Sequence, residues 1–447
     1  RRKLRKWIKS EFVNKNEDII AFFEFIDTRS SLTMRTVSKE KAHDYLYPNT
    51  PYHDLRIRHL LWMTTEIVEN FIIYNSVAQQ PSLKMQLLAQ YYTKNELYKF
   101  AHNSVEEGIA IMEKIKLRNA SYHLQQYQIQ ALHFQINSKN NRSKEFNLQD
   151  VIDHVTLFSI IETLKYACII QSLQKISELK IENHLLEATL TLVENPVFLE
   201  DIAVRIYYNI YLVIRDENEA AFNAFIKDVK ENENYFTTHD LKDLYLLAIN
   251  FCVKKSNQNL QEYTQQAFEL YIYAIDKGYL LEHREISRFS FTNVVTLGIK
   301  LKEFSKTENF IKQYADFIAE EYRQNTVDFN SAKVFFSKEQ PQKALKILLT
   351  NEFKDMLWNL NAKYMVIKIL FEMKDLVLFA NHLKAYKNYV KRKTNIGYHQ
   401  TYFINVVNAL TTLMDVYKKP ENFKGFEFDA STPDIEWFRK ALKNIDK

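Results

Sequence analysis

The chain has 447 residues, of which 46% are hydrophobic and 26% charged, and its formal net charge is +5. A single core rarely grows beyond about 250–300 residues, so a chain of this length forms either several domains or an elongated solenoid. Only 5 glycines occur, where average usage would give about 31; this argues against sheet folds with glycine-rich turns and phosphate loops, and the mild charge argues against a nucleic-acid binder as a whole.

Residues 1–80 are predicted to form an N-terminal helical segment. The apolar residues of PYHDLRIRHLLWMTTEIVENFIIYN recur at intervals of three and four, which places them on one face of a helix. Thr50 before Pro51 predicts the start of this helix, because an N-cap threonine is often followed by proline at the first helical position. The basic start, RRKLRKWIKSEF, lacks the apolar stretch of a signal peptide.

Residues 81–236 are predicted to form degenerate helical hairpins. Ser104 with Glu107 matches a capping box, which predicts a helix start at Ser104. The polar stretch NSKNNRSKEFN, residues 137–147, predicts a loop or hinge. Two sets of residues in this region fit the repeat spacing defined in the next paragraph: Leu88, Tyr91 and Phe100, and Tyr208, Tyr211 and Ala220.

Residues 237–447 are predicted to form tetratricopeptide-like repeats that end in a capping helix. The spacing rule is an apolar or small residue at i, i+3 and i+12, because i and i+3 on the first helix of a pair meet i+12 on the second. The first positions of three such sets lie 34 and 35 residues apart, near the tetratricopeptide period. The sets are Gly298, Leu301 and Phe310; Ala332, Phe335 and Ala344; and Ile367, Leu370 and Phe379.

The expected fold is therefore all-α: a right-handed α-solenoid superhelix of antiparallel, tetratricopeptide-like helix pairs behind the N-terminal helical segment. The tryptophan and proline of the full tetratricopeptide pattern are missing from most units. Antiparallel helical hairpins without repeat ancestry are the alternative.

Several segments resemble an uncharacterised bacterial family of helical-repeat proteins. The likeness is carried by FVNKNEDIIAFFEFI and KEKAHDYLYPNTPYHDLRIRHLLWMTTEIVENFI near the start, and by TNVVTLGIKLKEFSKTENFI, FNSAKVFFSKEQPQKAL and IEWFRKAL later in the chain. Val13 departs from the tyrosine that is more usual in the family. The resemblance implies a tetratricopeptide-like superhelix and supplies no catalytic residues.

No motif for catalysis, a cofactor or a metal is found. GxxxxGK[ST], GxGxxG, GxSxG and HExxH are all absent, and His53 and His59 are six residues apart, on opposite sides of a helix. Cys168 and Cys252 are expected to be buried thiols in a reducing compartment. No run approaches the roughly 18 apolar residues of a membrane span. The protein is therefore expected to be cytoplasmic, without a membrane span, and not an enzyme.

The first helices of the predicted repeats are expected to line a concave binding surface. Its inward-facing residues are Thr292, Lys302, Lys333, Phe336, Tyr364, Lys368 and Phe371. Three lysines and three aromatics suit an extended peptide with acidic and apolar side chains. The alternative interpretation is that Phe336 and Phe371 belong to the core and the lysines are simply solvated.

The expected function is that of a non-catalytic scaffold that binds a protein or peptide partner on the concave face. One alternative is a nucleic-acid-associated or transcriptional regulator that uses the basic N-terminus, with RIRH on an exposed helix face. Another is a structural subunit of a larger assembly. Two clusters carry the basic charge, and both also fit solvated helix ends: Arg1, Arg2, Lys3, Arg5, Lys6 and Lys9, and Lys384, Lys387, Lys391, Arg392 and Lys393.

Overall fold

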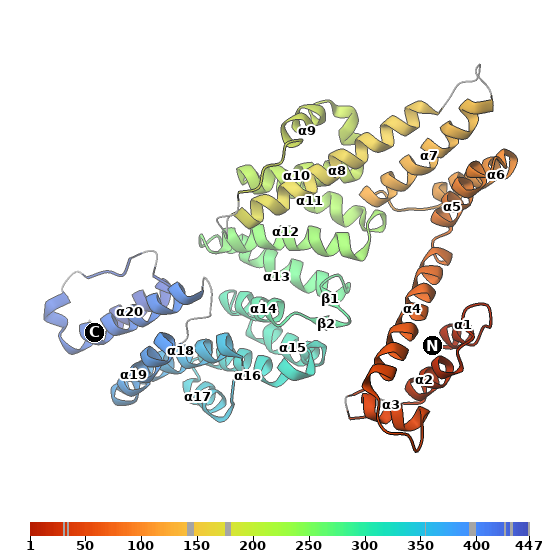
Figure 1. Ribbon diagram of the computed structural model, residues 1–447. Helices are drawn as coiled ribbons and strands as arrows, with labels where there is room; N and C mark the ends of the chain where they lie inside the picture. The colour runs from red at the N-terminus through yellow and green to blue at the C-terminus, as the bar shows by residue number, and fades with distance from the viewer. Residues whose placement is uncertain are drawn as a thin grey trace. The chain divides into compact units, whose positions relative to one another are not determined.

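The computed structural model is all-α and describes residues 1–29, 32–33, 35–140, 147–174, 180–353, 355–392, 399–423, 426–429 and 432–445. Within these residues the chain forms 21 α-helices, and helices that follow one another are in contact (Figure 1). The chain divides into two compact units, Arg1–Tyr211 and Leu212–Lys447. The three-part division expected from the sequence stays a prediction.

The first unit holds the N-terminal helices and the middle of the chain. Its helices are α1 (Arg2–Ile8), α2 (Glu17–Asp27), α3 (Lys39–Leu46), α4 (Asp54–Ala78), α5 (Pro81–Lys94), α6 (Tyr98–Glu113), α7 (Ala120–Asn140), α8 (Leu148–Gln174), α9 (Leu186–Val193) and the 3-10 helix Pro196–Glu200. Helix α10 (Ile202–Asp216) runs across the boundary between the units.

The second unit holds the remaining helices and one short β-hairpin. They are α11 (Glu219–Glu231), α12 (Thr238–Ser256), α13 (Gln261–Asp276), β1 (Leu281–Glu282), β2 (Glu285–Ile286), α14 (Arg288–Lys300), α15 (Phe304–Tyr314), α16 (Glu320–Ser337), α17 (Pro341–Thr350), α18 (Met356–Glu372), α19 (Leu376–Arg392), α20 (His399–Lys418) and α21 (Ile435–Ile445). Three 3-10 helices, Glu233–Tyr235, Ala315–Phe317 and Pro420–Phe423, lie between them. The two-residue strands are too short to give the alternation that would have predicted them.

Two predicted helix starts are wrong. Helix α4 begins at Asp54, and the ring of His53, instead of Thr50, caps it by accepting the N–H of Arg56. The Thr50 hydroxyl donates to the carbonyl of Tyr47 at 2.8 Å instead. Ser104 lies within α6, where it is buried, so it caps nothing. Both segments match a capping pattern by residue type alone. In the structure α4 begins later, and α6 begins earlier, than that pattern predicts.

Helix α8 is the one helix among the described residues that is long and apolar enough to cross a membrane by length and composition, although no such run was expected. Its Ile160, Ile161, Leu164 and Cys168 are buried, and α8 packs against α7 and α9. The same length and composition are also found in core helices, and 33% of the most apolar part of α8 is buried. The polar stretch expected to form a loop begins too early, because its residues 137–140 belong to α7, and its residues 141–146 lie outside the described residues.

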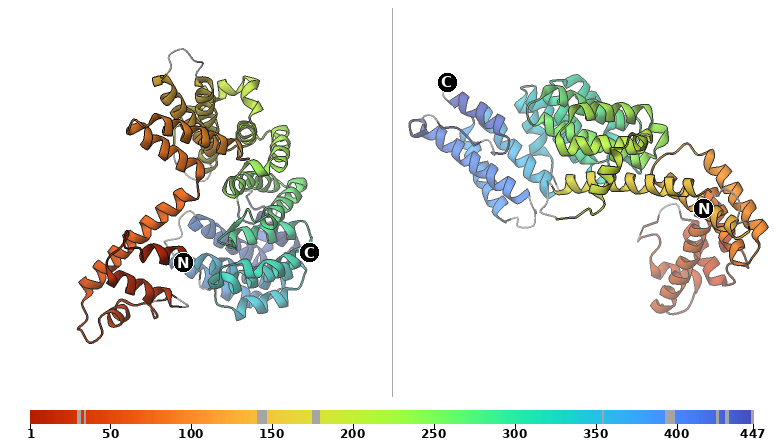
Figure 2. Two further views of the ribbon diagram at one scale, coloured as in Figure 1. Left: turned by 90° about the vertical axis from the view of Figure 1, so that its right-hand side faces the viewer. Right: turned by 90° about the horizontal axis from the view of Figure 1, so that it is seen from above.

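In the second unit the helices α12 to α19 form hairpins that lie side by side (Figures 1 and 2). The pairs α12/α13, α14/α15, α16/α17 and α18/α19 each pack together. The pair α5/α6 of the first unit forms a hairpin of the same kind. The expected capping helix is α21, whose Phe438 and Ala441 are buried in the same apolar cluster as α18 and α20.

Each of these five hairpins turns through one non-glycine residue in the left-handed conformation. These residues have φ between 58° and 65° and are Glu96, Asn259, Lys302, Glu339 and Lys374. In each turn the N–H of the next residue donates to the carbonyl five positions back, at 2.8–3.4 Å. This bond is the defining contact of a Schellman helix end, which satisfies a carbonyl that the helix leaves open. The five hairpins therefore share one turn geometry without glycine.

The turn residue fixes which side chains the two helices bury against each other. The residue seven positions before each turn is fully buried: Ala89, Cys252, Val295, Ala332 and Ile367 are each 0% exposed. The residue five positions after each turn is also buried: Ala101, Thr264, Thr307, Ala344 and Phe379 are at most 5% exposed. These two positions hold the same interval of twelve residues as the rule used for the sequence.

The sequence-based register is correct for α16/α17 and α18/α19, where Ala332, Ala344, Ile367 and Phe379 occupy these positions. It is wrong by three residues for α14/α15. There the matching set is Val295, Gly298 and Thr307, so the turns at Lys302, Glu339 and Lys374 are 37 and 35 residues apart. Gly298 and Leu301 were chosen because they also fit the spacing, but Leu301 lies beyond the helix as its C-cap.

The register is also wrong by one residue in α5/α6. Tyr91 and Phe100 are 61% and 56% exposed, whereas Ala89 and Ala101, the residues directly after the predicted Leu88 and Phe100, are fully buried. Similarly, Ala220 is exposed and Ala221 is buried. Small residues allow two helices to approach closely, so alanine beside a large aromatic was the better choice at these positions.

Replacing a left-handed turn residue by glycine should stabilise the fold. Lys374→Gly removes the contact between Cβ and carbonyl that makes φ near +59° unfavourable, so we expect a gain of about 1 kcal/mol in the free energy of unfolding. The matched control is Lys387→Gly, an exposed position inside α19 of the same hairpin, which should lose about 1 kcal/mol. Urea denaturation of both variants measures the difference. A loss of similar size in both would contradict the turn geometry.

Adding one methyl group at Gly298 should destabilise the α14/α15 hairpin. A Cβ at this position would lie 2.1 Å from Thr307 Oγ1 and 3.2 Å from the Phe268 ring, so Gly298→Ala should cost about 1–3 kcal/mol. Thr307→Ala removes the clashing oxygen, and the double variant should recover part of that loss. Additive losses in the double-mutant cycle would show that the two side chains do not meet.

Candidate partner-binding surface

An open pocket of about 260 Å³ lies among the first helices of successive hairpins in the second unit. Its lining comes from four helices of this unit, α14, α16, α18 and α20, which are labelled in Figure 1. The lining residues are Phe289, Thr292, Asn293, Phe329, Leu357, Trp358, Asn361, Tyr402 and Phe403. Phe289 is 57% and Tyr402 40% exposed. Aromatic side chains thus surround the pocket while two of them stay open to solvent.

A row of polar contacts crosses from α14 to α16 beside this pocket. Asn330 Nδ2 donates to Thr292 Oγ1 at 3.0 Å, and Lys333 Nζ donates to Thr296 Oγ1 at 2.5 Å. Lys333 also lies 6.0 Å from the centre of the Phe329 ring, which lines the pocket. The buried Asn330 Oδ1 has no hydrogen-bond partner. The Oδ1 atom of Asn330 and the ammonium group of Lys333 therefore lie beside the pocket.

A second lysine, on α18, binds a carboxylate from the end of the chain. Lys368 Nζ lies 2.5 Å from Asp434 Oδ2, and the Tyr364 hydroxyl donates to the same oxygen at 3.0 Å. Lys368 also lies over the Trp437 ring at 5.1 Å. Because burial and the nearby Asp434 charge both disfavour the phenolate, the pKa of Tyr364 is raised, so the hydroxyl remains a donor. This surface binds an acidic side chain next to aromatic rings.

The environment of Lys333 disfavours its positive charge. The pKa of Lys333 is lowered from an ordinary value of 10.5 to about 8, chiefly by burial and also by the Lys368 charge, while Asp434 opposes the shift. The lysine was expected to be an exposed cation. It is instead a half-buried one, and this difference changes what a substitution there should do to stability.

The structure brings together most of the residues proposed for the concave surface. Thr292, Lys333, Tyr364 and Lys368 take part in the contacts just described, and Phe336 lies 5.9 Å from Lys368 Nζ. Lys302 does not join them, because it is the left-handed turn residue after α14. Tyr364 and Phe371 are 6% and 7% exposed, and Phe371 packs on Phe379 and Trp437. Tyr364 was expected to be exposed, and for Phe371 the alternative interpretation as a core residue is the correct one.

Some residues of the pocket were not predicted. Phe289, Trp358 and Tyr402 line it, and Asp434 lies 66 residues from the lysine that it binds. In the corrected register Phe289 and Asn361 hold equivalent positions, because each lies 13 residues before its turn. This equivalence would have indicated Phe289 as a pocket residue. No spacing rule connects Asp434 with Lys368, because the intervening helices set that distance.

Two of the six basic side chains in the N-terminal cluster pair with acidic side chains in the structure. Arg5 pairs with Asp27, and Lys9 lies 2.5 Å from Glu24. In RIRH, Arg58 lies 2.6 Å from Asp54. The second basic cluster lies on α19, where Lys384, Lys387, Lys391 and Arg392 are exposed, and its Lys393 lies outside the described residues. The ion pairs of Arg5, Lys9 and Arg58 are typical of a solvated helix surface, which is the simpler interpretation of these basic residues.

The chain matches no known protein-family model and no curated protein sequence. The resemblance to an uncharacterised bacterial family therefore stays a prediction. Its coarse part, an all-helical fold in which successive helices pack together, is shown by the structure.

Lys333→Met should stabilise the protein at pH 7, because it keeps the aliphatic stem and removes a desolvated charge. The wild-type lysine is charged in both states below pH 8. Between pH 8 and 10.5 the folded state releases its proton first, so wild-type stability rises with pH. The advantage of the variant should therefore shrink over that range. Urea denaturation of both proteins from pH 7 to 10.5 measures the difference, in which the other titrating groups cancel; a constant difference would contradict the assigned environment.

Proposed function

We propose that the protein is a non-catalytic scaffold that binds an acidic and apolar segment of a partner protein on the surface formed by α14, α16, α18 and α20. The carrying observation is the contact of Asp434 with Lys368 and Tyr364. A carboxylate is bound there beside aromatic rings, which is the chemistry that a partner segment with the same groups would use.

The neighbouring pocket supplies the apolar part of such a contact. Phe289 and Tyr402 are exposed at its rim, and Trp358 and Phe403 form its inner wall. Aromatic residues are enriched among the anchors of protein interfaces, where they bury large areas at a small entropic cost. An apolar side chain of the partner inserted here would lie near Lys333, so that one segment could use both features.

The helix pairs α12/α13 to α18/α19 are proposed to be tetratricopeptide-like units of one right-handed solenoid. The shared Schellman turns and the two buried positions around each turn support this proposal. The separations of 43, 37 and 35 residues between successive turns, from Asn259 to Lys374, approach the tetratricopeptide period of about 34 only toward the C-terminus. In such units the first helices line one face, which is where the pocket lies.

The proposal predicts the kind of peptide that the full chain selects. From a displayed library of random peptides, wild-type protein should enrich sequences that place aspartate or glutamate near an aromatic or branched aliphatic residue. Phe289→Ala combined with Tyr402→Ala should lower the affinity for a synthesised winner at least about tenfold, since two interface anchors are removed.

Phe100→Ala is the matched control, because Phe100 is as exposed as Phe289 but lies on α6. It should bind the peptide like the wild type. Melting temperatures of all three proteins check that folding is unchanged. If the double variant binds as well as the control, or if the enriched peptides carry no acidic residue, the proposed surface is not the binding site.

A further inference from the structure

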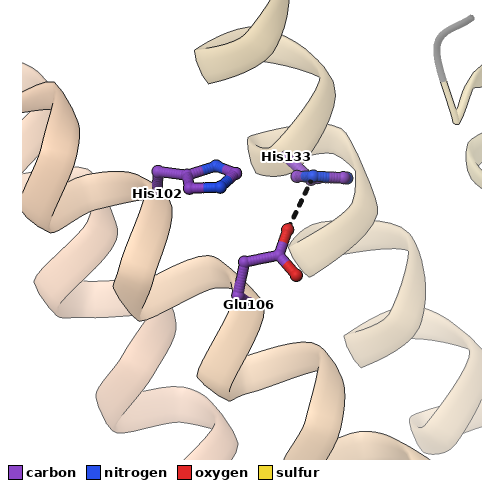
Figure 3. Close-up of side chains that lie close together, drawn as sticks. All are labelled: His102, Glu106 and His133. Atoms are coloured by element: carbon purple, nitrogen blue, oxygen red, sulfur yellow. Dashed lines mark ion pairs between the residues drawn. The ribbon is translucent and has the colours of Figure 1, made fainter.

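We propose that His102, Glu106 and His133 form a binding site for a divalent transition-metal ion, with Zn²⁺ as the natural candidate. One ligand atom from each of these residues lies within 4.8 Å of the others. Figure 3 shows His102 and Glu106 on one helix and His133 on the facing helix, with the Glu106 carboxylate directed at the His133 ring. The site belongs to the first unit, whereas the surface proposed to bind a partner belongs to the second.

The local sequence places two of the ligands on one face of α6. His102 and Glu106 are four residues apart, so they lie one helical turn from each other. Both side chains are exposed, while Ala101 and Val105 beside them are buried in the hairpin. The packing of α6 therefore presents the imidazole and the carboxylate at the edge of the helix interface, where an ion could reach them from solvent.

Close contact between α6 and α7 brings the third ligand into place. A Cβ at Gly108 would lie 2.9 Å from Ile129 Cδ1, so the absent side chain lets the two helices approach. Ile129 is fully buried, and His133 follows it by one helical turn on α7. The backbone positions of all three ligands are thus fixed by the core, and an ion would not have to order a loop.

The distances suit a metal after a small side-chain movement. His133 Nε2 and Glu106 Oε1 are 3.0 Å apart, close to the separation of about 3.4 Å between two ligands of a tetrahedral Zn²⁺ with bonds of about 2.0–2.1 Å. The rings of His102 and His133 are near one another, with centroids 6.2 Å apart at 29°. Rotation of the exposed His102 ring would complete a three-ligand set.

The ligand types select the class of ion. Two imidazoles with one carboxylate favour Zn²⁺, Co²⁺, Ni²⁺ or Cu²⁺ over Mg²⁺ and Ca²⁺, which prefer an all-oxygen environment. Three protein ligands leave a further position for water. The Nδ1 of His133 is buried without a hydrogen-bond partner, so the orienting contact that strengthens many zinc sites is missing. This site is therefore expected to bind less tightly than a structural zinc centre.

The test uses the full chain after removal of any histidine tag and treatment with a chelator. At pH 7.5, titration with Zn²⁺ in isothermal calorimetry should give one ion per chain, and Co²⁺ should produce visible absorption bands from nitrogen and oxygen ligation. His102→Ala and, separately, Glu106→Gln should each lower the affinity at least tenfold. Both residues are exposed, so the metal-free variants should melt at the wild-type temperature.

His239→Ala is the matched control. His239 also has a carboxylate four residues later, with its Nδ1 3.5 Å from Asp243 Oδ2, but this pair on α12 belongs to no group of three ligands among the described residues. The control should keep wild-type affinity. The proposal is overturned if the wild type binds no ion, if His102→Ala and Glu106→Gln bind as tightly as the wild type, or if His239→Ala loses the ion to the same extent.

Discussion

The hairpins of this protein depend on one backbone constraint, a non-glycine residue held at positive φ between two helices that pack closely. This conformation is unfavourable for a residue with a Cβ, and no local side chain relieves it at Glu339 or Lys374 among the contacts of the described residues. It persists because the positions around it bury their side chains completely, with Ala332 and Ala344 as one example. The turn and the packing therefore support each other: the left-handed residue sets the register, and the buried pair keeps the chain in the left-handed turn.

The same register determines what each first helix presents to solvent. Thr296, Lys333 and Lys368 all lie six residues before their turns, so they form one row across α14, α16 and α18. The hydrogen bond from Lys333 to Thr296 connects two neighbours in that row. The row thus follows from the hairpin geometry, because equivalent positions of successive hairpins are brought side by side. Its chemistry changes along the row from a hydroxyl on α14 to ammonium groups on α16 and α18, and the ammonium group on α18 is paired with Asp434.

Helical periodicity was enough to predict the all-α fold, and the spacing rule was enough for the register of two hairpins. It failed at α14/α15 and α5/α6 for a physical reason. Val295 and Gly298 both fit the first position of the rule in α14/α15, and Leu88 and Ala89 both fit it in α5/α6, so several registers satisfy the same pattern. The feature that distinguishes them, the left-handed turn, leaves no signal in the sequence when lysine or glutamate occupies it instead of glycine or asparagine. Only Asn259 among the five turns carries the expected residue type. The candidate surface was accordingly found in outline, with Lys302 included by the register error and Phe289 omitted.

The contacts that no spacing could reveal are those between helices distant in sequence, and they have consequences for binding. Asp434 is held near Lys368 by the same chain, so it acts at a high effective concentration compared with a carboxylate on a separate partner. A partner that used Lys368 would have to displace it, whereas one that used Lys333 and the pocket would not. The lowered pKa of Lys333 fits this division, because a carboxylate placed beside that lysine would restore the charge that burial disfavours. The open part of the surface is therefore centred on Lys333 and the aromatic pocket, and the contact of Lys368 with Asp434 joins the turn before α21 to α18.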